Sequence, residues 1–174
     1  MDKYLLSQIS VIIATIFISF TYFSKNRKIF LLLFILYSIF YGIHYLLLNA
    51  LTGFLMNLVS IIRNIIFFKY EVKKKENSKL FLILLFSIII IFGVYSYKDL
   101  FSIISILASL LSTYSVWQKN TKVYRILAVV VSVCFIIYAV HIKSLFAIIT
   151  EIILLFAEFV GLILLKVQKN QIIQ

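Results

Sequence analysis

The chain has 174 residues, of which 64% are hydrophobic and 13% charged, and its formal net charge at pH 7 is +11. The charged share is about half that of soluble domains, which excludes a soluble globular fold and indicates a protein that faces lipid. The Lys and Arg residues gather between apolar runs, as in membrane loops, so the positive charge does not indicate nucleic acid. The single cysteine, Cys134, excludes an internal disulfide.

Seven apolar stretches follow one another along the chain. Each approaches the length of about 20 residues that a membrane span needs. They lie at about 4–23, 30–49, 51–70, 79–97, 100–118, 123–142 and 144–166. No cleavage site follows the first stretch, so it is expected to be a span and not a removed signal peptide. The sequence therefore predicts an all-α polytopic membrane protein with seven transmembrane helices in a single domain, residues 1–174.

The basic residues are distributed unequally between the two sides of such a protein. If the spans alternate in direction, the side poorer in basic residues holds Lys3, Lys98 and Lys143. The richer side holds Lys25, Arg27, Lys28, Lys69, Lys73, Lys74, Lys75, Lys79, Lys119, Lys122, Arg125, Lys166 and Lys169. Because positive loops stay in the cytoplasm, the N-terminus is expected outside and the C-terminus inside.

An internal repeat joins the two halves of the chain. The sequence Lys25-Asn26-Arg27-Lys28 recurs 94 residues later as Lys119-Asn120-Thr121-Lys122. Polar residues within spans are few and costly, so their recurrence at one offset indicates a true repeat. The pairs are Thr15 with Ser109, Ser19 with Thr113, Ser38 with Ser132, Asn57 with Glu151, and Asn64 with Glu158. We expect two parallel three-helix repeats, residues 1–70 and 99–174, joined by a linker helix within 71–98.

Several short motifs are spread along the chain: the basic turn after the first span, Gly42-Ile43-His44-Tyr45, Ile61-Ile62-Arg63, Leu111-Ser112-Thr113 and Glu151. Together they resemble the motifs of the YgjV family of bacterial inner-membrane proteins. The resemblance covers nearly the whole chain. It implies a multi-pass protein of the bacterial inner membrane and brings no activity with it.

The layout of three, one and three helices is similar to that of the SWEET sugar transporters, the PQ-loop proteins and the PnuC vitamin transporters. The Pro-Gln pair of the PQ-loop group would fall where this chain has Phe23-Ser24 and Trp117-Gln118. The missing proline argues against a proline-hinged rocking motion, and a shared fold is weak support for a shared function.

Buried carboxyl and amide groups are the main candidates for a binding site. Glu151 and Glu158 lie two helical turns apart, so they share one face of the last span. Asn57 and Asn64 form the matching face of the third span. Such groups normally face the bundle interior, so we expect these four side chains to line a cavity at the midplane. The alternative is structural: neutralised carboxyls, and amides that hydrogen-bond between helices.

Arg63 and His44 are further candidates. Arg63 is expected either to pair with Glu158 at a similar depth or to extend toward the membrane interface. His44 is expected to line the cavity or act as a proton-sensitive gate, whereas His141 is expected at the interface. A metal site is not expected, because the two histidines lack further ligands.

Trp117 and Gln118 end the fifth span, where they would serve as a gate or as an interface anchor. No catalytic constellation or cofactor motif occurs, so neither an enzyme nor a bound cofactor is expected. The leading hypothesis is a transporter or facilitator for a polar small molecule, and the alternative is a membrane scaffold or partner subunit. The expected partners are the lipid bilayer and this small molecule, with a homo-oligomer left open and no nucleic acid.

Overall fold

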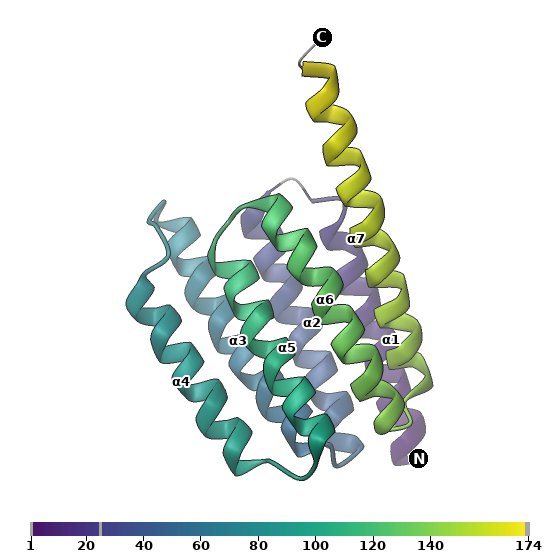
Figure 1. Ribbon diagram of the computed structural model, residues 1–174. Helices are drawn as coiled ribbons and strands as arrows, with labels where there is room; N and C mark the ends of the chain where they lie inside the picture. Colours follow the sequence, from purple (N-terminus) through teal and green to yellow (C-terminus); the bar gives the residue numbers. More distant parts are fainter. Residues whose placement is uncertain (1, 25, 173–174) are drawn as a thin grey trace.

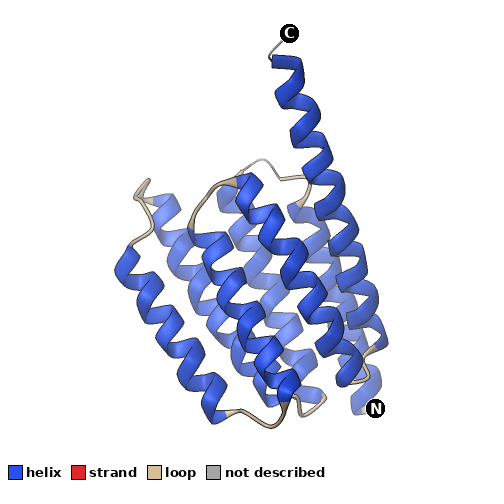
Figure 2. Cartoon of the chain, in the orientation of Figure 1, coloured by secondary structure: helices blue, strands red, loops and turns tan. Residues whose placement is uncertain are grey.

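The computed structural model describes residues 2–24 and 26–172, with side chains described as far as residue 166. Within these residues the chain forms helices and short loops without any strand (Figure 2). The helices are α1 (Lys3–Thr21), α2 (Arg27–Leu47), α3 (Leu51–Val72), α4 (Lys79–Tyr95), α5 (Leu100–Trp117), α6 (Thr121–His141) and α7 (Leu145–Ile172). The all-α membrane fold predicted from the sequence is therefore confirmed.

Each helix coincides with one of the seven predicted apolar stretches. All helices except α4 are long and apolar enough to cross a membrane, taking α7 as far as Lys166. Helix α4 has 17 residues, which give a length of roughly 25 Å at 1.5 Å per residue. That length is at the lower limit for a span. In Figure 1, α4 nevertheless runs from one end of the bundle to the other.

Six of the helices form a closed ring. Each neighbouring pair in the order α1, α2, α3, α5, α6, α7 is in contact, and α7 closes the ring against α1. Helix α4 packs against α3 and α5 from outside the ring, as Figure 1 shows. Most polar side chains of the helices are buried inside this ring, and the outward faces are rich in exposed Leu, Ile and Phe.

The loops define two ends of the bundle. We call the end with the α1–α2, α3–α4 and α5–α6 loops the basic end, and the other the opposite end; α7 leaves the bundle at the basic end (Figure 1). Asn26 and Asn120 cap α2 and α6 at the basic end through their side-chain oxygens. Lys25 of the predicted basic turn and the side chain of Lys169 lie outside the described residues. Which end faces the cytoplasm stays a prediction.

Corresponding turns of the two halves have the same backbone structure. Asn49 after α2 and Lys143 after α6 both have φ of 55°, in the left-handed region. The amide of Ala50 donates to the carbonyl of Tyr45 at 2.9 Å, and that of Ser144 donates to Ala139 at 3.0 Å. These are the hydrogen bonds of a Schellman motif, at positions 94 residues apart in the two halves.

The contacts between the two triplets are also matched. A twofold axis that exchanged α1–α3 with α5–α7 would convert the α1·α7 contact into the α5·α3 contact, and both occur. Gln8 of α1 accepts a hydrogen bond from the Phe146 amide at 3.2 Å, and Thr52 of α3 donates to Ser102 of α5 at 3.5 Å. Ser102 lies 94 positions after Gln8, and Phe146 lies 94 positions after Thr52, so the two bonds join corresponding positions. The parallel repeat stays a prediction, and these contacts are what it requires.

Candidate functional site

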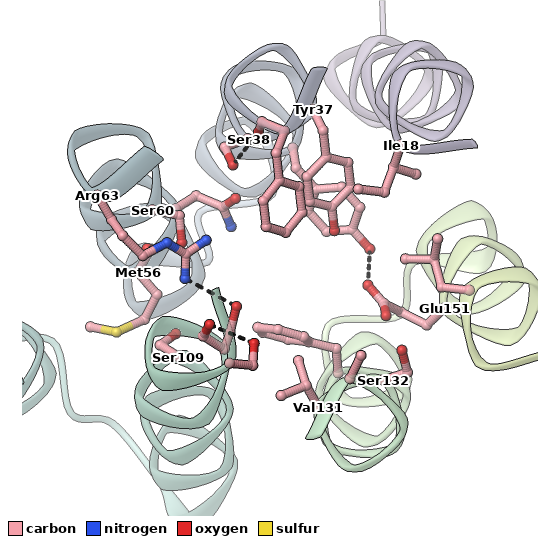
Figure 3. A pocket seen from close by; sticks show the side chains of 18 of the residues that line it. Ile18, Tyr37, Ser38, Met56, Ser60, Arg63, Ser109, Val131, Ser132 and Glu151 are labelled. Carbon is pink, nitrogen blue, oxygen red and sulfur yellow. Dashed lines mark hydrogen bonds between the residues drawn. The ribbon is translucent and has the colours of Figure 1, made fainter. Parts of the chain in front are cut away.

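A polar cavity lies inside the helix ring, between the two triplets. Its volume is about 70 Å³, which has room for a few water-sized groups. Figure 3 shows the side chains that project into it from different helices. Its polar lining consists of Tyr22, Tyr37, Ser38, Tyr41, Tyr45, Asn57, Ser60, Arg63, Ser109, Ser112, Ser115, Tyr124, Ser132, Glu151 and Glu158. The predicted positions Asn57, Glu151 and Glu158 are among them, as are both members of the Ser38 and Ser132 pair.

Glu151 forms one wall of the cavity. It projects from the second turn of α7 and is 2% exposed. The hydroxyl of Tyr41 on α2 donates a hydrogen bond to Oε1 of Glu151 at 3.1 Å. No basic side chain that the structure describes forms an ion pair with this carboxyl group. A polar wall therefore joins α2 of the first triplet to α7 of the second.

Arg63 forms the opposite wall, as Figure 3 shows. Although it is 1% exposed, no Asp or Glu among the described residues forms an ion pair with it. Its Nη1 donates to Ser112 at 3.0 Å and to Thr113 at 3.2 Å. Its Nε donates to Asn64, and the ring of Phe34 lies 5.5 Å from the guanidinium carbon. Neutral acceptors thus hold the side chain in place while its charge is left uncompensated.

A second hollow, the vestibule, lies between this cavity and the basic end. Its volume is about 240 Å³, and it shares Tyr22, Tyr124 and Glu158 with the cavity. Its other polar residues are Thr21, Ser24, Arg27, Lys119, Thr121 and Arg125. The shared side chains therefore stand at the junction of the two spaces.

Glu158 is held at this junction from two helices. The Nη1 of Arg125 on α6 lies 3.0 Å from Oε2 of Glu158, and the hydroxyl of Tyr22 donates to Oε1 at 3.1 Å. Gly161 lies one turn further along α7, and a Cβ added there would overlap the guanidinium of Arg125. The missing side chain at Gly161 thus allows Arg125 to lie against α7 and reach Glu158.

The predicted pair of Arg63 with Glu158 is wrong. Helix α3 contacts α2, α4 and α5, whereas α7 contacts α6 and α1, so the two residues lie on different sides of the ring. The prediction was based on the similar depth of the two residues in the membrane, and depth does not determine on which side of the helix ring a residue lies. Arg125, which the sequence analysis placed at the start of the predicted span 123–142 and counted with the basic residues of the richer side, lies on the adjacent helix α6 and pairs with Glu158 instead.

Packed aromatic side chains close the cavity on the side of the opposite end. Tyr45 of α2 and Tyr138 of α6 are buried, with ring centroids 5.7 Å apart. The hydroxyl of Tyr138 accepts a hydrogen bond from the Gly53 amide of α3 at 3.1 Å. A Cβ at Gly53 would lie only 2.8 Å from the Tyr45 ring, so glycine permits this close contact. The cavity is therefore separated from the opposite end and adjoins the vestibule at the basic end.

The model of a family of bacterial inner membrane proteins, Imp-YgjV, matches residues 5–169. The chain belongs to this family. It is accordingly a multi-pass protein of the bacterial inner membrane, as the sequence motifs predicted. No curated protein and no solved structure matches it significantly, so the likeness in layout to the SWEET, PQ-loop and PnuC transporters stays a prediction.

Two predicted site residues of this Imp-YgjV protein lie behind the cavity wall. Asn64 is fully buried and accepts the hydrogen bond from Arg63, and its Nδ2 has no partner among the described residues. His44 is also fully buried, and its Nδ1 lies 3.0 Å from the carbonyl oxygen of Ser7 on α1. Asn64 therefore positions Arg63, and His44 packs between α1 and α2 near the opposite end.

Trp117 and Gln118 lie at the basic end outside the cavity lining. The indole N–H of Trp117 donates to the carbonyl of Ser78 at 3.3 Å, and Asn77 donates to the carbonyl of Trp117. Gln118 donates to the carbonyl of Ser115 in the last turn of α5. These contacts tie the α3–α4 loop to the end of α5, and their gating role stays a prediction. The described residues contain no group of three or more potential metal-ligating side chains.

Several residues of the site were missed by the sequence reasoning. Tyr22, Tyr124 and Arg125 lie near helix ends, where a sequence does not distinguish a cavity rim from a loop. Another missed feature has a clear sequence signal. Aromatic residues recur every three or four positions along α2 at Phe30, Phe34, Tyr37, Tyr41 and Tyr45, and all but Phe30 line the cavity. This spacing predicts one helix face.

Proposed function

We propose that this Imp-YgjV protein is a transporter or facilitator for a polar small molecule, which crosses the inner membrane through the cavity between the two triplets. The observation that carries the proposal is the buried cavity itself, with Arg63 on one wall and Glu151 on the other (Figure 3). Ionisable groups at this depth are costly for a membrane protein and mark substrate or ion pathways in others.

The arrangement of the two ends supports alternating access. The cavity adjoins a vestibule at the basic end and is closed by Tyr45 and Tyr138 near the opposite end. Rocking of one triplet against the other would open the contact between Tyr138 and Gly53 and close the junction around Glu158. Rigid-body motion of repeats around a fixed midplane site is a common design of secondary transporters.

Uptake by proteoliposomes tests this function. Purified wild-type protein is expected to take up at least one member of a broad panel of labelled metabolites saturably, above the level of empty liposomes. Glu151→Gln is expected to lower that uptake by at least about tenfold, the factor that corresponds to 1.4 kcal/mol. Glu76→Gln is the matched control, because the Glu76 side chain is 94% exposed. Absence of uptake for the whole panel by folded, reconstituted protein would contradict the proposal.

A further inference from the structure

The cavity is lined by a basic and an acidic side chain that do not pair with each other. Arg63 contacts hydroxyl and amide acceptors, and Glu151 contacts the hydroxyl of Tyr41. No ion pair joins either residue to any described side chain. Glu158, the remaining carboxylate of the lining, is already paired with Arg125. The walls thus present one free cation and one free acid across an enclosed space.

The donors of Arg63 are arranged so that part of the guanidinium is left for a ligand. Its hydrogen bonds to described residues use Nε and Nη1, and none of them uses Nη2. Ser112, which holds Nη1, also lines the cavity. A guanidinium fixed in this way is preorganised to bind a carboxylate, because its remaining N–H groups have a fixed direction and its charge is unopposed.

The Glu151 wall has the chemistry for an ammonium group. A carboxylate offers acceptors for the three donors of an amine, and the hydroxyls of Ser132 and Tyr41 beside it provide further acceptors. Aromatic rings also favour a cation close to their faces, and Tyr37 and Tyr41 line the cavity on this side of α2. The same wall would oppose a second negative charge on the ligand.

We propose that the transported molecule is a small zwitterion, whose carboxylate faces Arg63 and whose ammonium group faces Glu151. This inference rests on the proposed function and names its substrate class. A zwitterion neutralises both walls at once, whereas an anion leaves Glu151 unopposed and a cation leaves Arg63 unopposed. The cavity volume of about 70 Å³ restricts the molecule to a few non-hydrogen atoms.

Uptake of isosteric probes by proteoliposomes tests the substrate class. Glycine carries both charges, glycolate the negative one, ethanolamine the positive one and glycolamide neither; β-alanine and γ-aminobutyrate place the two charges further apart. We expect at least one of the three zwitterions to exceed glycolate, ethanolamine and glycolamide by at least about tenfold in the wild-type protein, which is the effect of one charge-assisted contact. Glu76→Gln is expected to leave this order unchanged.

The two wall residues are expected to control the order of the probes in opposite directions. Glu151→Gln is expected to transfer the preference from the zwitterion to glycolate, and Arg63→Gln to transfer it to ethanolamine. A purely structural role would lower the uptake of all probes equally. If Arg63→Gln does not fold, Arg63→Lys and Glu151→Gln carry the test, because Lys keeps the charge and is expected to weaken zwitterion uptake without favouring ethanolamine.

Two results would overturn the inference while the transport function stood. One is uptake of glycolate, ethanolamine, glycolamide or any other compound that is not a zwitterion at least equal to that of every zwitterion. The other is a probe order that Glu151→Gln leaves unchanged. Failure of the proposed function is a different result, because then no compound of any charge enters above the level of empty liposomes.

Discussion

Arg125 and Glu158 form an ion pair at 3.0 Å that joins α6 to α7 at the junction of the cavity and the vestibule. The Glu158 side chain is 2% exposed and that of Arg125 is 20% exposed, so water screens the pair weakly. The carboxylate also accepts a hydrogen bond from the hydroxyl of Tyr22, the residue that follows α1. One acidic group therefore links the last two helices to the first, across one of the two interfaces between the triplets.

Removal of one partner of this pair is expected to destabilise the protein more than removal of both. Glu158→Gln and Arg125→Gln each leave a poorly solvated charge, and we expect each to cost about 1.5–3 kcal/mol of unfolding free energy. The double variant leaves no such charge and should be more stable than the sum of the two losses predicts. Thermal unfolding of the four proteins in detergent measures this coupling. Additive losses would show that the pair contributes nothing of its own.

Gly161 offers a way to displace Arg125 without changing any charge. A Cβ at this position would overlap the guanidinium, so Gly161→Ala is expected to push Arg125 away from Glu158 and to cost about 1–3 kcal/mol. Gly42→Ala is the matched control, because the nearest atom to its added Cβ is Asn57 Cβ at an ordinary 3.7 Å. That control should be neutral or stabilising, since Ala favours a helix over Gly by about 1 kcal/mol.

The same thermal unfolding assay checks this explanation of Gly161→Ala. In a Glu158→Gln background the alanine should cost much less, since the contact it disrupts is already absent. An equal loss in both backgrounds would indicate that the added methyl group disturbs the packing of α7 itself.

The helices could be predicted from the sequence because charged or polar residues bound almost every apolar run. Lys3, Asn26, Lys79, Asp99 and Asn120 stand at or next to helix starts, and the four side chains Asp2, Asn26, Asp99 and Asn120 cap helices through their oxygens. The candidate cavity residues were found for the same reason. A polar side chain such as Asn57 or Glu151 is conspicuous within an apolar run, and its cost in lipid directs it inward.

The pairing of side chains could not be predicted in this way. The depth of a residue in the membrane follows from its position along a span. Which side chains lie close to it depends on the order of the helices around the ring, which cannot be read from the sequence. The Arg63 and Glu158 error arose from this gap. Arg125 was missed because it lies in the first turns of α6, where a basic residue is usual at a membrane boundary and carries no signal of its inward contact.

Asp99 links the stability of the opposite end to pH. The backbone N–H of Ser102 and the nearby His141 lower the pKa of the Asp99 carboxyl from its ordinary value of 3.8, and His141 Nε2 lies 2.9 Å from Oδ2. Because the folded pKa lies below the unfolded one, the ionised group stabilises the fold above the ordinary value. This contribution is lost as the pH falls through the folded pKa.

Thermal unfolding of wild type and Asp99→Asn between about pH 7 and pH 3 measures this effect. Asn keeps the helix cap but does not titrate, so the wild type is expected to be the more stable at neutral pH. The two curves should converge at the acidic end of the range. A constant difference across the range would mean that ionisation of Asp99 contributes nothing.

Water in the cavity distinguishes a transporter from a scaffold whose buried polar groups only join helices, as Thr15 of α1 and Thr150 of α7 do at 2.6 Å. In a Cys134→Ala background, single cysteines at Ser115 and Ser132 replace cavity-lining hydroxyls with groups of similar size. Ser105→Cys is the control, because Ser105 is fully buried and lies outside the cavity lining. Small hydrophilic thiol reagents react with the hydrated thiolate, so a dry site is protected.

We expect both cavity cysteines to react with the permanently charged reagent 2-(trimethylammonio)ethyl methanethiosulfonate at least about tenfold faster than the control, since burial in apolar surroundings suppresses the thiolate. Reaction in inverted vesicles and not in right-side-out ones would place the basic end in the cytoplasm, because the vestibule adjoins the cavity from that end. Reaction from the other face would reverse the predicted orientation.

If Ser115→Cys and Ser132→Cys are as unreactive as Ser105→Cys, the core is dry. Glu151 and Arg63 would then have to be explained as structural groups without a pathway between them.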